Sequence, residues 1–390
     1  MYSWEQRKLS DISTKVTTKN VDVHYTETLT NSAEQGIISQ VDFFDKEISN
    51  KDNINGYYIV DNNDFIYNPR ISTLAPVGPI NRNKLNRTGI MSPLYTVFRS
   101  SNVDLGFLEW YFQSSHWHRY MKLNGDSGVR ADRIAIKDST FFEMPIKIPV
   151  NIKEQVLIGE TLEKFNQYIT LHQRKLDNLK LKKKALLQKL FPKNGERYPE
   201  LRFPGFTDAW EQRKANYIFN SVTDKGYPEL PVLSASQELG MVYRDQNGID
   251  IQHDKKNETS YKRVLPGQFV IHLRSFQGGF AYSEVEGITS PAYTVMSFKN
   301  SSEQYGLFWK HVFKSETFIK RLETITYGIR DGRSISFSDF KSLILQYPSF
   351  SEQKLIGGSI EIIESGITLH QRKLEHLKLQ KKALLQQMFV

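Results

Sequence analysis

The chain has 390 residues, of which 39% are hydrophobic and 12% aromatic, so it can build the cores of two or three domains and is not intrinsically disordered. Its formal net charge is +9 at pH 7, which favours a polyanionic partner such as nucleic acid without requiring one. The absence of cysteine excludes disulfide scaffolds and cysteine-ligated zinc, and no apolar run approaches the ~20 residues that span a bilayer, so we expect a cytoplasmic protein with no membrane partner.

Residues 1–150 are predicted to form a first globular domain that mixes strands and helices. Short runs of β-branched and aromatic residues, bounded by turn residues, predict strands at 57–60 and 95–98. A helix is predicted to follow the second of these strands, over 105–120. The domain is therefore expected to have its own core.

Residues 151–192 are predicted to form a long central helix. Alternate steps of three and four residues from Leu162 fall on apolar side chains at most positions, which is the a/d pattern of a coiled coil. The helix spans roughly 58 Å at a rise of 1.5 Å per residue. A histidine, His172, interrupts the apolar seam, and Pro192 ends the helix because proline cannot continue it.

Residues 193–348 and 349–390 are predicted to repeat this plan as a second globular domain and a distal helix. Strands are predicted at 268–273 and 293–298, and a helix at 305–322. The distal helix carries the same seam with the same histidine interruption. The seam residues are Leu162, Phe165, Ile169, His172, Leu176, Leu179, Ile360, Ile363, Ile367, His370, Leu374 and Leu377.

The two halves of the chain are related by an internal repeat. Residues 169–191 and 367–389 are identical at eighteen of twenty-three positions, which excludes chance similarity. Residues 4–8 and 210–214 both read Trp-Glu-Gln-Arg-Lys. The globular domains are far more divergent, so two different globular units sit on two matching helices. A pseudo-twofold relation between the halves would make the helices antiparallel.

Both globular domains carry turn-rich segments with Arg, Lys, Asn, Gln and Ser, the side chains that read base edges and hold phosphates. One such loop is ordinary solvated surface, but its recurrence in two divergent domains favours a functional interpretation. The candidate DNA contacts are Arg70, Arg82, Lys84, Arg130, Arg133, Lys225, Ser234, Ser236, Gln237, Arg274, Gln277, Arg330 and Arg333. Arg130 and Arg330 could instead pair with carboxylates of their own domains.

The motifs of common enzymes are missing from the chain. It contains no GxxxxGK phosphate loop, no GxGxxG dinucleotide motif and no zinc-binding His-Glu-x-x-His. Residues 68–70, Asn-Pro-Arg, resemble only the first half of the Asn-Pro-Pro-Tyr motif of amino-methyltransferases and lack its second proline and its aromatic residue. We therefore expect no catalytic residue, and no metal or cofactor bound by this chain.

The duplicated plan of a globular domain and a long helix resembles the specificity (S) subunit of type I restriction-modification enzymes, HsdS, over essentially the whole chain. The residues that carry the resemblance are the two Trp-Glu-Gln-Arg-Lys openings, the two Ser-Pro-x-Tyr-Thr-Val strands and the two helices with Leu-His-Gln-Arg-Lys-Leu. Residues 199–206 are similar to the family's entry into its second recognition domain. The first domain starts at Trp4 without a counterpart of that segment, from which we expect a truncated or naturally short N-terminus.

The resemblance implies an α+β fold in which two pseudo-symmetric α/β target recognition domains are separated by two long antiparallel coiled-coil helices. Each domain would read one half of a bipartite, asymmetric site in double-stranded DNA, and the helices would set the gap. Two methyltransferase (M) subunits and two restriction/translocase (R) subunits would dock on this chain. S-adenosylmethionine, ATP and Mg²⁺ would then belong to those partners, and this chain would be non-catalytic by itself.

Two other interpretations remain open from the residues alone. One is a non-catalytic, two-headed coiled-coil scaffold, in which the basic charge serves solubility or RNA binding. The other is an enzyme in which one globular domain hides a hydrolase site without a known motif.

Overall fold

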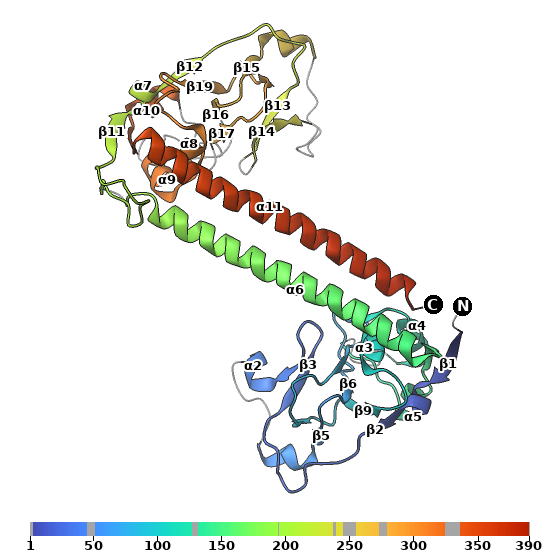
Figure 1. Cartoon of the computed structure of the whole chain (residues 1–390). Helices are drawn as coiled ribbons and strands as arrows, with labels where there is room; N and C mark the ends of the chain where they lie inside the picture. The colour runs from blue at the N-terminus through green and yellow to red at the C-terminus, as the bar shows by residue number, and fades with distance from the viewer. Residues whose placement is uncertain are drawn as a thin grey trace. The chain divides into compact units, whose positions relative to one another are not determined.

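The structure is a computed structural model that describes residues 3–44, 51–126, 132–193, 195–236, 239–244, 255–272, 279–323 and 336–389. The chain forms two compact units, which we call unit 1 (residues 1–173 with 372–390) and unit 2 (residues 174–371). The boundary between them falls within both long helices, α6 (Ile152–Lys189) and α11 (Phe350–Gln387) (Figure 1). Each unit therefore contains a globular part and one segment of each long helix.

Unit 1 is built on a four-stranded antiparallel sheet in the order β2-β9-β6-β7, flanked by the two-stranded pairs β1-β10, β3-β4 and β5-β8. The predicted strands at 57–60 and 95–98 are confirmed as β5 and β9. The strands are β1 (Trp4–Lys8), β2 (Ser13–Lys15), β3 (Leu29–Ser32), β4 (Gly36–Ser39), β5 (Tyr58–Val60), β6 (Phe65–Tyr67), β7 (Ile80–Arg82), β8 (Gly89–Met91), β9 (Thr96–Ser100) and β10 (Pro145–Pro149).

The helix predicted over 105–120 is two helices, α3 and α4, with a break between them. The chain leaves the helix at Ser114, whose backbone is extended, and the Trp117 indole then donates to the Phe112 carbonyl at the end of α3. The short helices of unit 1 are α1 (Leu9–Ile12), α2 (Gln40–Phe44), the 3₁₀ helix η1 (Lys51–Gly56), α3 (Leu105–Gln113), α4 (His118–Asn124) and α5 (Asp138–Phe142).

Unit 2 has the same strand order, β12-β19-β16-β17, flanked by β11-β20, β13-β14 and β15-β18. Each strand of unit 2 therefore has a counterpart in unit 1. The strands are β11 (Glu211–Lys214), β12 (Phe219–Val222), β13 (Leu233–Ser236), β14 (Gly240–Tyr243), β15 (Lys262–Val264), β16 (Phe269–Ile271), β17 (Phe280–Tyr282), β18 (Gly287–Thr289), β19 (Thr294–Phe298) and β20 (Ile344–Tyr347).

The predicted strands at 268–273 and 293–298 are β16 and β19, and the helix predicted over 305–322 is again two helices, α8 and α9. The break lies between Val312 and Glu316. There the amides of Lys314 and Ser315 donate to the carbonyls of His311 and Val312. The short helices of unit 2 are α7 (Ala215–Ile218), the 3₁₀ helix η3 (Lys255–Ser260), α8 (Gly306–Val312), α9 (Glu316–Glu323) and α10 (Phe337–Ser342).

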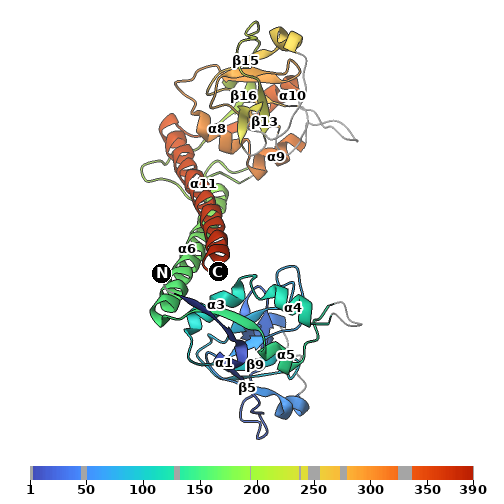
Figure 2. The ribbon, with the colours of Figure 1, turned by 90° about the vertical axis from the view of Figure 1, so that its right-hand side faces the viewer.

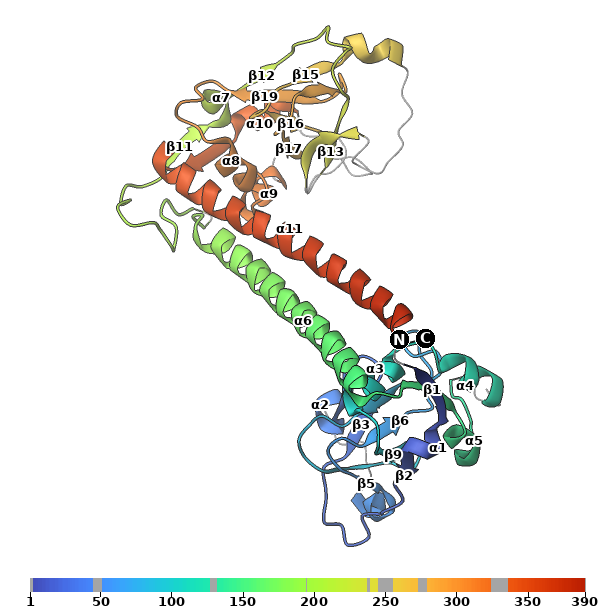
Figure 3. The ribbon, with the colours of Figure 1, turned by 45° about the vertical axis from the view of Figure 1, so that its right-hand side comes forward.

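A glycine lets each long helix approach the globular part of its unit closely. In unit 1, α3 lies between the sheet and α6 (Figure 3), and a Cβ on Gly159 would stand 2.8 Å from the Phe107 amide nitrogen. In unit 2, α8 lies between the sheet and α11 (Figure 2), and a Cβ on Gly357 would stand 2.7 Å from the Phe308 amide nitrogen. Since no real Cβ tolerates such contacts, only glycine fits at either position.

The core of each unit is completed by a phenylalanine from the C-terminal end of a long helix segment. Phe389 is buried in unit 1, with its ring 5.3 Å from that of Phe107 and 5.7 Å from that of Tyr111. Phe191 is buried in unit 2 and stacks on Phe308 at 5.7 Å. The two matching segments, 169–191 and 367–389, thus end in the residues that close the two cores.

Within each unit, the segments of α6 and α11 run antiparallel. In unit 1 the Lys381 Nζ donates to the Asn166 Oδ1 at 2.9 Å, and in unit 2 the Lys183 Nζ lies 2.6 Å from the Glu364 Oε1. The separation from 166 to 183 equals that from 364 to 381, so both units use one register. The seam residues of both helices are buried or half-buried.

Among the described residues, no helix is long and apolar enough to cross a membrane.

Candidate nucleic-acid interface

A network of side-chain amides holds strand β3 of unit 1 to its neighbours. The buried Asn31 Nδ2 donates to the carbonyls of Ile66 at 2.7 Å and Pro79 at 3.2 Å. Its Oδ1 accepts from the Asn81 Nδ2 at 2.7 Å, and the Asn81 Oδ1 accepts from the Gln113 Nε2 at 2.9 Å. Because these amides bind one another, they fix the shape of the surface beside them.

A cavity of about 350 Å³ opens beside this network, and the candidates Arg70 and Arg133 both line it. An antiparallel bridge joins these two residues: the Ile71 amide donates to the Asp132 carbonyl at 2.9 Å, and the Ile134 amide donates to the Pro69 carbonyl at 2.9 Å. We call this cavity the arginine groove. It brings together two segments that lie far apart in the sequence.

Arg70 remains available to a ligand in this groove. Its side chain is 69% exposed, and its Nε lies 3.9 Å from the Asp132 Oδ2. An exposed pair at that distance contributes ~0–1 kcal/mol, so a phosphate or a base edge could replace the carboxylate. The groove therefore presents cationic donors on a fixed frame.

Arg82 and Lys84 lie elsewhere in unit 1, beside α6. The Arg82 Nη2 is 2.7 Å from the Glu109 Oε2, and the Lys84 Nζ is 3.0 Å from the Glu109 Oε1 and 3.8 Å from Glu163. Both cations line a second cavity of about 490 Å³ together with these carboxylates. Their charges are balanced within the unit, so they are weaker candidates for a phosphate than Arg70.

In unit 2 the described candidates are Lys225, Ser234 and Ser236. Ser234 and Ser236 lie on β13, and the Ser236 Oγ accepts from the Leu239 amide at 3.2 Å. Lys225 is exposed and forms an antiparallel bridge with Lys262. The other candidates, Arg130 in the first domain and Gln237, Arg274, Gln277, Arg330 and Arg333 in the second, lie outside the described residues.

Lys262 is a basic residue of this surface that the sequence did not single out. Its Nζ donates to the Tyr293 carbonyl at 2.6 Å. Burial, together with the neighbouring charge of Lys225, lowers the pKa of Lys262. The signal in the sequence was only a lysine at the start of a short strand, which is too common to be specific.

Other missed residues are the apolar side chains at the edge of the arginine groove. Phe43, Phe44, Leu74 and Leu94 line it and are exposed. They are apolar, so a search for charged and polar loop residues could not find them.

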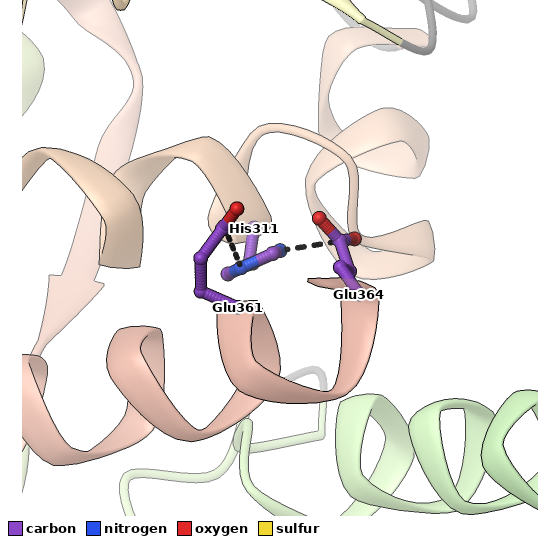
Figure 4. Close-up of side chains that lie close together, drawn as sticks. All are labelled: His311, Glu361 and Glu364. Atoms are coloured by element: carbon purple, nitrogen blue, oxygen red, sulfur yellow. Dashed lines mark ion pairs between the residues drawn. The ribbon is translucent and has the colours of Figure 1, made fainter. Parts of the chain in front are cut away.

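The polar cluster in which a metal ion could be held lies at the junction of α8 and α11 in unit 2. Figure 4 shows His311 between Glu361 and Glu364, with its Nε2 3.8 Å from the Glu361 Oε2 and its Nδ1 4.0 Å from the Glu364 Oε1. However, the Lys310 Nζ lies 3.0 Å from Glu361, and Lys183 already pairs with Glu364. Because ammonium groups balance both carboxylates, we interpret the cluster as an ion-pair network and assign no metal to it.

Burial governs the charge of this cluster. It lowers the pKa of His311 to about 4, against the attraction of Glu364. The imidazole is therefore neutral at pH 7. No nucleophile, base and oxyanion donors converge here or in the arginine groove among the described residues.

An exposed apolar stripe follows the long helices on the side away from their seam. In unit 1 it includes Leu157 and Leu171, and in unit 2 Leu355, Ile362 and Leu369. The last three are spaced by seven residues, which keeps them on one face of the helix. A stripe of this kind marks a surface that a protein could cover.

Comparisons with known proteins identify the fold. No protein-family model and no curated protein sequence matches the chain. A crystal structure of the S subunit of a type I restriction-modification system from M. genitalium matches 100% of this chain and 96% of its own at 13% identity and a TM-score of 0.59. The chain has that fold.

Two further structures match over the whole chain with lower scores. One describes complex assembly and conformational transition of a type I restriction-modification system, with a TM-score of 0.47 and 13% identity over 100% of this chain and 98% of its own. The other is the HsdS subunit from Thermoanaerobacter tengcongensis, with a TM-score of 0.45 and 14% identity over 99% and 96%.

Proposed function

We propose that this chain, which has the fold of a type I restriction-modification S subunit, is the DNA-specificity subunit of such a system. Each unit reads one half of a bipartite site in double-stranded DNA. The observation that carries the proposal is the arginine groove, in which Arg70 and Arg133 are bridged side by side on a rigid frame. Arginine is the side chain that most often reads guanine, through its O6 and N7 atoms.

The two half-sites should differ in sequence. Both units have the same strand order, so they can address DNA in the same way. Their exposed side chains differ, because the groove of unit 1 carries arginines while the described surface of unit 2 carries Lys225 and Lys262. Two units with the same strand order but different exposed side chains predict an asymmetric DNA site.

The proposed partners follow from the helices. The apolar stripe of Leu157, Leu171, Leu355, Ile362 and Leu369 offers each of two M subunits a similar surface, because Leu157 and Leu171 recur as Leu355 and Leu369 in the second half. Two R subunits complete the proposed complex. S-adenosylmethionine, ATP and Mg²⁺ act in these partners in the cytoplasm, and this chain contributes specificity without catalysis.

Binding selection with the assembled complex of this chain and its M subunits tests the proposal. Methylome sequencing of cells that express both chains is the independent readout. We expect a single bipartite motif with an unread gap. A continuous motif, or no motif, would contradict the specificity function.

Arginine variants test the role of the groove. Arg70→Ala and Arg133→Ala are expected to weaken binding, either uniformly with a salt slope reduced by about one for a phosphate contact, or by ~1–3 kcal/mol at one base pair for a base contact. Arg119→Ala removes the same charge from exposed α4 of unit 1 and is the control. If both groove variants bind like Arg119→Ala at several salt concentrations, the groove does not contact DNA.

The same assay separates the alternative of a scaffold or an RNA-binding protein. Duplex RNA of the same sequence presents a deep, narrow major groove that side chains do not read. Equal affinity for RNA and DNA, or no affinity for either, would favour the alternative.

A further inference from the structure

Leu94 stands at the edge of the arginine groove with most of its side chain in solvent. It is 64% exposed, on a turn in which the Tyr95 amide donates to the Ser92 carbonyl at 3.1 Å. The Ser92 Oγ also accepts from the Leu94 amide at 3.4 Å. The turn holds this leucine outward on a defined backbone, so its exposure is built into the fold.

Other apolar side chains line the same cavity. Phe43 and Phe44 on α2 are each 41% exposed, with their rings 4.6 Å apart in an edge-to-face arrangement. Leu74 is 70% exposed. These side chains and the two arginines form one lining, so a ligand that reaches the arginines also meets an apolar surface.

The major groove of DNA offers one apolar group, the C5-methyl of thymine, while the other base atoms exposed there are donors and acceptors. A surface that combines arginines with apolar side chains is therefore complementary to a guanine and a thymine methyl. Binding of the phosphate backbone would require cationic side chains only, with no apolar surface.

Unit 2 carries the same turn with a smaller side chain. The Tyr293 amide donates to the Ser290 carbonyl at 3.1 Å, and the Ser290 Oγ accepts from the Ala292 amide at 3.3 Å. Ala292 is exposed and stands where unit 1 has Leu94. The two turns share a backbone structure and differ in the size of the apolar side chain. This is the pattern expected of a specificity-determining position.

We propose that unit 1 reads a thymine through packing of its C5-methyl on Leu94, beside a base or phosphate held by Arg70 and Arg133. The proposal rests on the DNA-specificity function and names the chemistry that unit 1 recognises within it. Phe43, Phe44 and Leu74 line the same groove and make up the rest of its apolar surface.

Replacement of thymine by deoxyuridine tests the contact, because it removes the methyl group and leaves base pairing intact. The complex of this chain with its M subunits is titrated with the bipartite duplex, in which each thymine of both half-sites and both strands is replaced in turn. A buried methyl contributes ~0.8 kcal/mol, so we expect affinity to fall about fourfold at one position. The other positions should change little.

A double-mutant cycle links that position to Leu94. Leu94→Ala should lower affinity for the thymine duplex about fourfold and show no further loss with deoxyuridine at that position. Ala292→Leu changes the same turn of unit 2 and is the matched control. This variant should keep the full deoxyuridine effect at the thymine position that is assigned to Leu94. Equal thermal stability of the variants confirms that both fold.

The outcomes separate this proposal from the function on which it rests. If the complex selects a bipartite site but no deoxyuridine effect disappears in Leu94→Ala, the thymine contact is wrong and the specificity function stands. If Leu94→Ala weakens assembly with the M subunits instead, Leu94 belongs to a protein interface and the proposal is overturned. If no bipartite site is selected, both proposals fail.

Discussion

The stability of unit 2 is expected to fall between pH 7 and pH 5 because of His311. This side chain is 1% exposed, and its Nε2 is a buried nitrogen without a hydrogen-bond partner among the described residues. The groups that face it are Glu361 and Glu364 on α11, and the ammonium groups of Lys310, Lys314 and Lys183. The lysines balance the carboxylates, so burial decides the outcome and the folded state keeps the imidazole neutral.

The magnitude follows from the pKa of His311, which is 6.5 as the ordinary value and about 4 in the folded chain. A pKa that folding lowers means that the unfolded chain binds the proton more readily. The stabilisation is therefore present above pH 6.5 and is lost as the pH falls toward 4. The loss amounts to about 2 kcal/mol between pH 7 and pH 5, and to about 3 kcal/mol below pH 4.

The pH window is chosen to isolate this histidine from Glu364. Burial raises the pKa of Glu364, but its bond with Lys183 and the neighbouring cations outweigh burial and lower that pKa below its ordinary 4.5. The stability that Glu364 contributes is therefore lost only below the window. Groups that titrate equally in parent and variant cancel when the two are compared.

The assay is urea unfolding of the full chain at pH 7 and pH 5, followed by pulsed hydrogen exchange with mass spectrometry, which reports α8 and α11 separately from unit 1. His311→Leu removes the titrating group and puts an apolar side chain in its place, so the stability of this variant should be less sensitive to the pH change by about 2 kcal/mol. His24→Leu, at an exposed position of unit 1, controls for the loss of an imidazole. If the parent and His311→Leu lose the same stability, the buried neutral histidine is refuted.

Three further predictions concern the long helices. Phe389→Ala should destabilise unit 1 by ~3–5 kcal/mol, because it leaves a cavity among aromatic rings, while hydrogen exchange in unit 2 stays unchanged; equal loss in both units would contradict this. Asn166→Glu should add an ion pair with Lys381 like the one in unit 2, raising the stability of unit 1 by ~0.5 kcal/mol at low salt and by little at 1 M salt; a gain that high salt does not reduce would show another cause. Four residues inserted after both Gln173 and Gln371, where the two units divide, should lengthen the unread gap of the DNA site by about one or two base pairs, since each helix grows by ~6 Å; methylome sequencing that shows an unchanged gap would refute the expectation that the helices set the gap.

The long helices were predictable because their signal is periodic and local. The three-and-four spacing from Leu162 and the stop at Pro192 predicted a helix that the structure places at Ile152–Lys189. The breaks after α3 and α8 were not predictable. They depend on side chains such as the Trp117 indole, which finds its acceptor only in the folded chain.

The candidate interface was predictable only in part. Arg70 and Arg133 could be named as basic loop residues, but their bridge joins segments whose pairing no local pattern shows. Arg82 could be named in the same way, although Glu109 on another element engages it. Leu94 was missed because no sequence pattern marks an exposed leucine as functional. Only the structure shows that it lines the groove of Arg70 and Arg133.

The burial of Phe389 has a consequence for how the protein is made. Unit 1 is made of two segments that lie far apart in the sequence, 1–173 and 372–390, whereas unit 2 is continuous from 174 to 371. On the ribosome, residues 1–173 emerge before unit 2, yet their core is completed only after α11 has left the exit tunnel. Until then Phe107 and Tyr111 lack the ring that covers them. A nascent chain in this state leaves these apolar rings uncovered, and unit 2 can finish folding before unit 1.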